Sequence, residues 1–433
     1  MYKKQKDNSR RRVVISGLGM ATSLGIRVED NWRKALEGVS GIKRLSLPDT
    51  GKSPIQAVGE ISEIDWREIC NEFIEEYQRE GERRILFALW AAKAALKEAG
   101  LDNNNDNRNR SGVVMAAGLG INRLEDVHGW INRESKFDFE RFGNEFSSIH
   151  KESLMRNNSN RPSALIAERF GLNGYNSTIT TACASASQAI GTAYRAIRRG
   201  DADVVVTGGA DSMINPVGLV FFVLLSAAAV SNDNPAEVCR PFDRKRSGLV
   251  MGEGAGVVIL EEESHALKRG AHIYAEVAGY ALTMDAHKVT APHPKGIGAE
   301  RSMMNALKDA CMNPEEIDYI NAHGTSTKLN DSAETMAIKK VFKDHAANIS
   351  VNSSKSLIGH LLAASGGPEL VFTALTVDRD EIHPTINQQN PDPKCDLDYV
   401  PNVKKSKKVH AAISNSFGFG GQNASIVVKK YRA

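Results

Sequence analysis

Short apolar runs bounded by glycine, each followed by a segment with helical spacing, constrain the fold of this chain most strongly. Three of these runs are Val13–Gly19 (VVISGLG), Asp203–Gly208 (DVVVTG) and Gly256–Glu261 (GVVILE), and their nearly unbroken apolar character is typical of strands buried on both faces. Glu82–Gly100 carries alanines and leucines at helical spacing and closes on a glycine, which predicts a long helix. Strands that alternate with helices in this way predict an α/β layered fold.

The pattern restarts near Ala271, and the two halves of the chain weakly resemble each other. STITTACASASQAIG, from Ser177, runs from a strand into a helix of small residues, and NISVNSSKSLIGHLLAASG, from Asn348, does the same. Two similar halves that face each other would bring both helix starts to one central site. We therefore predict one half over 13–270, with an irregular helical cap or insertion at about 120–161, and a second half over 271–433.

The charge and the apolar content exclude several classes of protein. The net charge is only +3 over 433 residues, so nucleic acid is not expected as the partner, and the basic segment 1–12 is predicted to be a disordered tail. No stretch is long and apolar enough for a membrane span, and Gly218–Val230 is predicted to be a buried core element. Five cysteines without regular spacing fit a reducing compartment, so we expect a cytoplasmic protein.

Cys183 is a candidate nucleophile because it falls where a predicted strand meets a predicted helix. The positive end of the helix dipole would lower the pKa of its thiol and favour the thiolate. The neighbours Ala182, Ala184, Ser185 and Ala186 are small, so a substrate carbonyl has room to approach. The alternative is a buried structural cysteine, and position alone gives both interpretations equal weight.

Two histidines are further candidates. His323 lies in NAHGTST, where glycine and hydroxyl residues suit a loop that contacts a ligand, although a turn histidine capped by threonines would look the same. His360 lies in SSKSLIGHLLAASGG near Lys355 and Glu369, which either orient a site as a buried pair or form an ordinary core salt bridge. We predict no metal site, because neither histidine has close ligand spacing to another histidine, cysteine or aspartate.

A glycine-rich segment, SNSFGFGGQN over 414–423, lies between two predicted terminal strands. Its glycines permit close approach, so a backbone N–H there would be able to face a developing oxyanion, whereas the plainer interpretation is a hairpin turn. Together, one cysteine, two histidines, a lysine, a glutamate and this loop are the groups expected for covalent acyl transfer.

Six long motifs carry a family resemblance that covers roughly Val13 to Lys429. They are TTACASASQAIG, GDADVVVTGGAD, RPFDRKRSGLVMGEGAGVVILEE, NAHGTSTKLNDSAE, SSKSLIGHLLAASGG and SNSFGFGGQN. In this order they resemble β-ketoacyl-[acyl-carrier-protein] synthases, most closely the type II elongating enzyme of fatty acid synthesis. The resemblance implies a thiolase-like fold, in which two related α/β halves form a five-layered α-β-α-β-α core, and it implies a homodimer.

The resemblance also implies a role for individual residues. Cys183 would receive the acyl chain, while His323 and His360 would bind the malonyl thioester carbonyl and assist decarboxylation. Lys355 would stand beside this site with Glu369 as its structural partner. Phe419 would act as a gate and, with Cys183, supply the backbone N–H groups of the oxyanion hole. The remaining implied contacts are Thr290, Thr325, Thr327, Phe417 and Phe222 for substrate, and Arg83 and Arg84 for the carrier protein.

The implied reaction is a decarboxylative Claisen condensation of a Cys-bound acyl chain with malonyl-[acyl-carrier-protein], giving 3-oxoacyl-[acyl-carrier-protein] in fatty acid elongation. It uses no metal or redox cofactor, and phosphopantetheine arrives on the acyl carrier protein. One alternative is a specialised polyketide ketosynthase, acting as a homodimer or with a partner subunit. Another is a non-catalytic chain-length-determining subunit, which the presence of Cys183, His323, His360 and Lys355 argues against.

Three departures from the family wording bear on these alternatives. Ser147–Arg161 is polar where relatives have an apolar segment that lines the dimer interface and the acyl pocket. Gln422 replaces a usual threonine or histidine in the glycine loop, and SLIGHLLAASGG differs from the commoner SMTGHLLGAAG. The sequence therefore leaves open the acyl chain length, the pathway, and the choice between homodimer and heterodimer.

Overall fold

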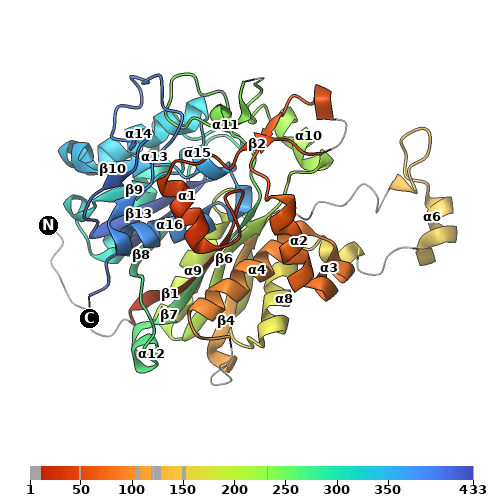
Figure 1. The fold of residues 1–433 in the computed structure, drawn as a ribbon, viewed down its shortest axis with the longest axis horizontal. Helices are drawn as coiled ribbons and strands as arrows, with labels where there is room; N and C mark the ends of the chain where they lie inside the picture. Colours follow the sequence, from red (N-terminus) through yellow and green to blue (C-terminus); the bar gives the residue numbers. More distant parts are fainter. Residues whose placement is uncertain are drawn as a thin grey trace.

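The structure, a computed structural model, describes residues 11–47, 50–102, 108–118, 120, 128–148, 153–231 and 233–432. Strands and helices alternate along these residues, and a 10-stranded sheet in the order β10-β9-β13-β14-β8-β1-β7-β6-β4-β5 runs through the molecule (Figure 1). The predicted α/β fold class is therefore confirmed.

Five strands of this sheet come from the N-terminal part of the chain. They are β1 (Val13–Ala21), β4 (Ser111–Ala117), β5 (Asn176–Ile179), β6 (Val204–Asp211) and β7 (Gly254–Glu262). Strand β4 pairs in parallel with both β5 and β6, while β7 pairs antiparallel with both β6 and β1. The spatial order is therefore β5-β4-β6-β7-β1.

The other five strands repeat this arrangement. They are β8 (Ala275–Met284), β9 (Tyr319–Asn321), β10 (Ser350–Asn352), β13 (Ala411–Phe417) and β14 (Gln422–Lys429). Strand β9 pairs in parallel with β10 and β13, and β14 pairs antiparallel with β13 and β8, in the order β10-β9-β13-β14-β8. The two sets meet where β1 pairs with β8. The division of the chain at 270/271 stays a prediction, and it falls between β7 and β8.

Helices form three layers around the two halves of the sheet. Helices α9 (Ser185–Arg199) and α16 (Gly366–Arg379) contact strands of both halves and form the middle layer. Helices α4 (Arg83–Glu98) and α8 (Arg161–Phe170) cover the outer face of the first half, and α13 (Ile297–Ala310) and α14 (Lys328–Phe342) lie on the second (Figure 1). This is the predicted five-layered, thiolase-like arrangement.

The small residues of the middle layer are required by close packing. A Cβ on Gly191 of α9 would lie 2.2 Å from the ring of Tyr280 on β8. A Cβ on Gly256 of β7 would lie 2.1 Å from the backbone nitrogen of Pro368 on α16. Glycine at these positions lets both helices approach the strands more closely than any larger residue allows.

The smaller elements connect and flank these layers. They are α1 (Val28–Leu36), α2 (Glu63–Glu72), α3 (Ile74–Glu80), α6 (Phe139–Glu145), α7 (Ser153–Arg156), α10 (Pro216–Leu224), α11 (Pro235–Val238), α12 (Glu263–Lys268), α15 (Lys355–Ile358), β2 (Lys43–Arg44), β3 (Ala57–Val58), β11 (Glu381–Ile382) and β12 (Lys405–Ser406).

The prediction that Gly218–Val230 is a buried core element is wrong. Helix α10 covers its first part, and Val220, Phe221 and Leu224 are 59%, 43% and 78% exposed, whereas Leu219 and Phe222 are buried. The segment is apolar on all sides of the helix, so its sequence does not distinguish the side that packs from the side that faces solvent. Among the described residues, no helix combines the length and hydropathy that crossing a membrane requires.

The predicted disordered tail is also too long. Arg11 forms an ion pair with Asp203, and Arg12 Nη2 lies 2.6 Å from Glu276 Oε2. Both carboxylates are largely buried, so they need a cationic partner. Order therefore begins no later than Arg11, and residues 1–10 lie outside the described residues.

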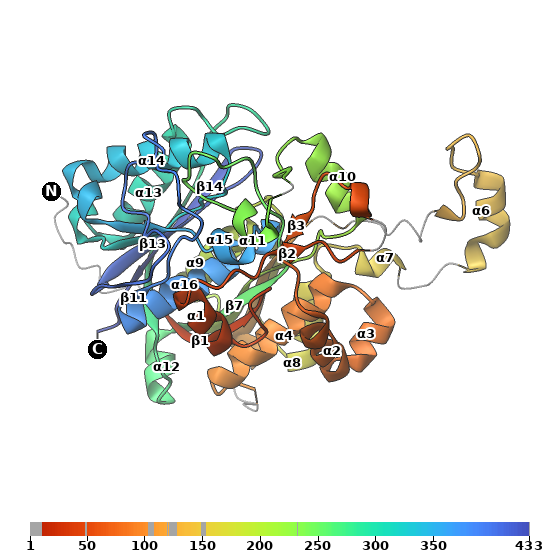
Figure 2. The same cartoon turned by 45° about the horizontal axis from the view of Figure 1, so that its top comes forward.

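The described parts of the predicted cap contain two short helices, α6 and α7. In two views of the molecule α6 stands well apart from the sheet and its covering helices (Figures 1 and 2). Trp130 and Phe137 pack against Phe139 and Phe142 of this helix, with ring centroids 4.8–5.4 Å apart. Residues 121–127 and 149–152 of the predicted cap lie outside the described residues.

Candidate active site

Cys183 lies in the turn between β5 and α9. Ala182 has a φ of 49°, in the left-handed region, and the Ser185 hydroxyl fixes the turn by accepting the Thr181 N–H (2.7 Å) and donating to the Ala182 carbonyl (2.6 Å). Helix α9 then begins at Ser185, two residues after Cys183. The thiol is 6% exposed and lines a pocket of about 390 Å³.

The two halves of the chain supply the groups around this thiol. His323 follows β9 and His360 follows α15, and one ring nitrogen of each lies within 4.8 Å of the other and of Cys183 Sγ. The two imidazole rings are nearly perpendicular, with centroids 5.4 Å apart. Both line the same pocket. One cysteine from the first half and two histidines from the second therefore share one site.

Hydrogen bonds determine which nitrogen of each imidazole carries the proton. The backbone N–H of Leu362 donates to His360 Nδ1 at 3.0 Å, so this nitrogen presents a lone pair. The ammonium of Lys355 lies 3.4 Å from His323 Nδ1 and can only donate. In both neutral rings the proton is therefore on Nε2, and His360 Nε2 has no partner among the described residues.

Both histidines are uncharged at neutral pH. Burial lowers the pKa of His323 and of His360 well below 6.5, and the positive charge of Lys355 acts in the same direction on both. Each ring therefore offers one neutral N–H donor beside the thiol.

The pKa of the Cys183 thiol is higher than the sequence led us to expect. Burial raises the pKa of Cys183 to about 11, while a hydrogen bond from the backbone N–H of Phe419 and the charge of Lys355 act to lower it. The expected helix dipole favours the thiolate as well, but it does not outweigh the desolvation of the buried sulfur. Cys183 therefore rests as a thiol.

Lys355 and Glu369 form an ion pair deep in the second half. The pair is 1–2% exposed, and Lys355 Nζ also donates to the backbone carbonyl of His323 at 2.6 Å. Burial raises the pKa of Glu369, and Lys355 opposes this shift. The pair thus ties α15 and α16 to the loop that carries His323.

Glu369→Gln is expected to lower the free energy of unfolding by about 3 kcal/mol or more, because it leaves the ammonium of Lys355 buried without an anion. Chemical denaturation measures this loss. Asp396→Asn is the matched control, because it breaks the exposed Lys339–Asp396 pair, which is about half exposed on both sides, and costs less than about 1 kcal/mol. Equal effects of the two substitutions would contradict a structural role for the buried pair.

Glu334 on α14 is a site residue to which sequence reasoning gave no role. Its carboxylate accepts the backbone N–H of His323 and that of Gly324, both at 2.9 Å. It is 1% exposed, and burial raises its pKa to about 7. The motif NAHGTSTKLNDSAE contains this glutamate, but only the fold shows that the helix turns back onto the histidine loop.

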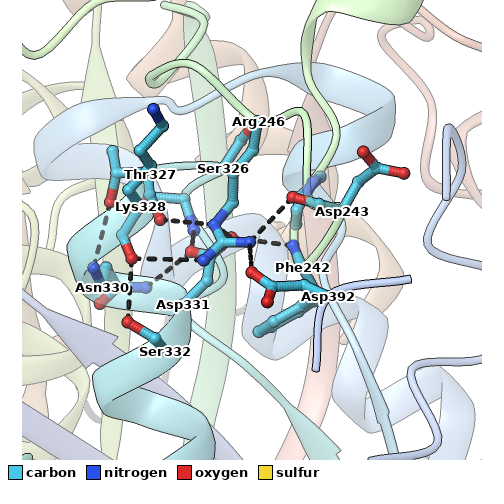
Figure 3. Close-up of polar contacts among 12 residues, drawn as sticks. Phe242, Asp243, Arg246, Ser326, Thr327, Lys328, Asn330, Asp331, Ser332 and Asp392 are labelled. Carbon is cyan, nitrogen blue, oxygen red and sulfur yellow. Dashed lines mark hydrogen bonds and ion pairs between the residues drawn. The ribbon is translucent and has the colours of Figure 1, made fainter. Parts of the chain in front are cut away.

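Arg246 holds the other end of the same loop (Figure 3). The guanidinium, 3% exposed, donates to the carbonyl of Thr327 at 3.0 Å and to that of Lys328 at 3.3 Å. It also donates to the carbonyl of Asp243 at 2.8 Å and to Asp392 Oδ2 at 2.6 Å. A buried arginine therefore joins the loop after β9 to the segment 239–249.

Asp331 completes this network from the first turn of α14. Its carboxylate accepts the N–H of Thr325 at 3.1 Å and the N–H of Phe242 at 2.8 Å, and it lies 3.5 Å from Arg246 (Figure 3). Burial raises its pKa, and the charge of Arg246 opposes this. The loop 323–327 is thus fixed at both ends before any ligand binds.

Most of the predicted substrate contacts do lie at the pocket. Thr290, Thr325, Thr327 and Phe417 line it, as does Phe419, the predicted gate, and the hydroxyls of Thr325 and Thr327 are 2.9 Å apart. Phe222 of α10 is not among the described residues that line this pocket. It is buried in the apolar cluster beneath α10, against which Phe419 packs.

The glycine loop is a hairpin turn between β13 and β14, and it also reaches the thiol. A Cβ on Gly418 would lie 3.1–3.2 Å from the backbone nitrogens of Ala184 and Cys183, so the loop backbone lies close to the start of α9. Gly420 donates to the carbonyl of Val289 at 2.6 Å. The side chain of Gln422 accepts a hydrogen bond of 3.3 Å from Gln188.

The structure contradicts a surface role for Arg84. This side chain is 4% exposed and donates to the carbonyl of Gly118 at 2.9 Å. Arg83 bonds Glu253 at 2.9 Å and stacks on Trp66 at 4.2 Å, with 32% of its side chain exposed. The resemblance implied a carrier contact for Arg84, and the sequence does not show that other parts of the chain bury this side chain.

Two copies of one α/β unit, with a thiol and two neutral imidazoles where they meet, define a thiolase-like ketosynthase fold. Residues 10–266 match the family described as beta-ketoacyl synthase, N-terminal domain, and residues 274–389 match the corresponding C-terminal domain. The chain belongs to the β-ketoacyl synthase family, which confirms the resemblance found in the sequence.

Similar proteins cover nearly the whole chain. It is 40% identical to 3-oxoacyl-[acyl-carrier-protein] synthase 2 of Synechocystis sp. over 98% of this chain and 99% of the relative. It is 38% identical to the protein of the same name from Staphylococcus aureus (strain N315), with the same coverage.

Among solved structures, a type II polyketide ketosynthase in complex with its acyl carrier protein (AntDE:AntF) has a TM-score of 0.87 and 32% identity, covering 98% of this chain and 100% of its own. The ishigamide ketosynthase/chain length factor has a TM-score of 0.83 and 32% identity, with the same coverage of both chains.

Proposed function

We propose that this protein is a β-ketoacyl-[acyl-carrier-protein] synthase that condenses an acyl group held on Cys183 with a malonyl group held on an acyl carrier protein. The observation that carries the proposal is the cluster of Cys183 Sγ with one nitrogen each of His323 and His360, all within 4.8 Å in one pocket. The relatives named 3-oxoacyl-[acyl-carrier-protein] synthase 2 support it.

In the first step the sulfur of Cys183 attacks the carbonyl carbon of an acyl thioester. The backbone N–H groups of Cys183 and Phe419 stabilise the oxyanion that forms. The bond from carbon to the carrier sulfur then breaks, and the proton lost from Cys183 goes to the departing pantetheine thiolate. The products are the acyl–Cys183 thioester and a free carrier thiol.

In the second step malonyl thioester enters the pocket. The N–H groups of His323 and His360 donate to its thioester carbonyl oxygen, on which negative charge grows as carbon dioxide leaves. The enolate carbon attacks the acyl–Cys183 carbonyl, a carbon–carbon bond forms, and the Cys183 thiolate departs and takes up one proton. Neutral imidazoles suit this task, because each must present an N–H donor.

We propose that no metal takes part. The argument from ligand spacing along the sequence is insufficient, because the fold brings Cys183, His323 and His360 close enough together to bind an ion. The ammonium of Lys355, 3.4 Å from His323 Nδ1, would repel a divalent cation there. Phosphopantetheine would arrive on the carrier protein and lie along Thr325 and Thr327, which line the pocket.

Fatty acid elongation is the pathway we propose, because the relatives named 3-oxoacyl-[acyl-carrier-protein] synthase 2 are 38–40% identical to this chain, whereas the polyketide structures are 32% identical. Polyketide synthesis is the second candidate, favoured by the polar segment Ser147–Arg161. A non-catalytic subunit is disfavoured because every reacting group is present. We also propose a homodimer, and a cytoplasmic location that suits five free cysteines.

Intact-mass measurement after incubation with carrier proteins that bear acyl chains of different length tests this proposal. We expect one acyl group on the protein, located on Cys183 by peptide mapping, and transfer to malonyl carrier with loss of carbon dioxide. The preferred chain separates fatty acid from polyketide substrates. Absence of acylation by every carrier would overturn the proposal.

A further inference from the structure

Ser365 contacts the imidazole of His360 at Nδ1. Its hydroxyl oxygen lies 2.8 Å from His360 Nδ1, and the residue is 3% exposed. Ser365 is the N-cap residue of α16, a position at which a serine side chain ordinarily accepts a hydrogen bond from a backbone N–H of the helix. Here it makes no such bond, and its backbone has helical angles (φ −48°, ψ −47°). The hydroxyl is therefore used for the imidazole and not for the helix.

The direction of this hydrogen bond follows from the second contact of the same nitrogen. The backbone N–H of Leu362, 3.0 Å from His360 Nδ1, can only donate, so Nδ1 carries a lone pair and no proton. The hydroxyl of Ser365 must then donate as well. Two donors, one from the backbone and one from a side chain, hold the same nitrogen.

We propose that Ser365 is a positioning residue that holds His360 in the tautomer with its proton on Nε2 and aims that N–H at the thioester carbonyl. A donor to Nδ1 withdraws electron density from the ring, so the Nε2–H becomes a stronger donor toward a developing enolate. The hydroxyl also restrains rotation of the His360 ring. The N–H of Leu362 alone would leave this ring freer to rotate. The consequence for catalysis rests on the proposed function, whereas the tautomer does not.

Ser365→Ala tests this proposal in two independent measurements. Malonyl decarboxylation is expected to slow about three- to tenfold, the loss of one hydrogen bond to a reacting group, while acylation of Cys183 keeps its rate. In protein labelled with ¹⁵N-histidine, the Nδ1 resonance of His360 is expected to move toward the position of an imidazole nitrogen with fewer hydrogen-bond donors. Ser365→Thr keeps the hydroxyl and is expected to restore both values.

Ser163→Ala is the matched control. It removes an equally buried hydroxyl, 2.6 Å from that of Thr178, on a helix outside the pocket, and it should change neither readout. A Ser365→Ala protein with the wild-type decarboxylation rate and an unmoved Nδ1 resonance would refute the proposal. Failure of the proposed function would look different, since the wild-type protein would then decarboxylate no malonyl thioester while the resonance still moved.

Discussion

Cys183→Ala is expected to abolish the acyl-enzyme and to lower the rate of condensation by at least about 10⁴-fold, because the substitution removes the only thiol that lines the pocket among the described residues. The turn at Ala182 and Ser185 uses backbone and hydroxyl contacts that alanine at position 183 leaves intact. The loss of activity should therefore come from the missing sulfur and not from unfolding, and the melting temperature should change little. Intact mass after incubation with acyl carrier protein measures it.

Two other cysteines serve as controls for this experiment. Cys311 is exposed, and Cys239 is buried with its sulfur 3.1 Å from the carbonyl of Lys355. Cys311→Ala and Cys239→Ala should both keep the acyl group, since neither sulfur lines the pocket. An acyl group that persists on Cys183→Ala protein would show that the nucleophile had been assigned to the wrong residue.

The layered fold could be predicted from the sequence because its strands are buried on both faces and its middle helices begin with small residues. Asp203–Gly208 and Gly256–Glu261 are apolar without alternation, which only a covered sheet permits. The repeat of the two halves was only weakly visible in the sequence, since the order of hydrogen-bonded strands in a sheet cannot be inferred from the sequence of either half. Helix α10 was misjudged because apolar residues all around a helix predict burial, and this helix leaves one side open.

The candidate site could be predicted as a set of residues but not as an arrangement. Motif wording pointed to Cys183, His323, His360 and Lys355, yet their separation along the chain gave no reason for them to meet. The supporting contacts were harder to predict. Glu334 accepts a backbone N–H of the histidine loop, and Ser365 contacts a ring nitrogen of His360, and only folding brings these groups together. The charge state of Cys183 could not be predicted from the sequence either, since desolvation depends on how deeply the fold buries the sulfur.

His360→Ala is expected to lower the rate of malonyl decarboxylation by about 10²–10³-fold while acylation of Cys183 survives, because in the proposed mechanism this histidine donates to the malonyl oxygen and not to the acyl chain. Separate assays measure the two steps: release of carbon dioxide from malonyl carrier, and mass increase with acyl carrier. An equal loss in both steps would place His360 in acylation, and no loss in either would remove it from the site.

His383→Ala separates this chemical effect from the cost of deleting any buried histidine. His383 is fully buried against Phe372, with ring centroids 5.1 Å apart, and burial lowers its pKa to about 4. Its ring does not line the pocket, so the substitution should destabilise the core through a cavity but leave decarboxylation within about twofold. If both substitutions slowed decarboxylation equally, the effect of His360→Ala would be one of packing, and the hydrogen bond from Nε2 to the enolate would lose its support.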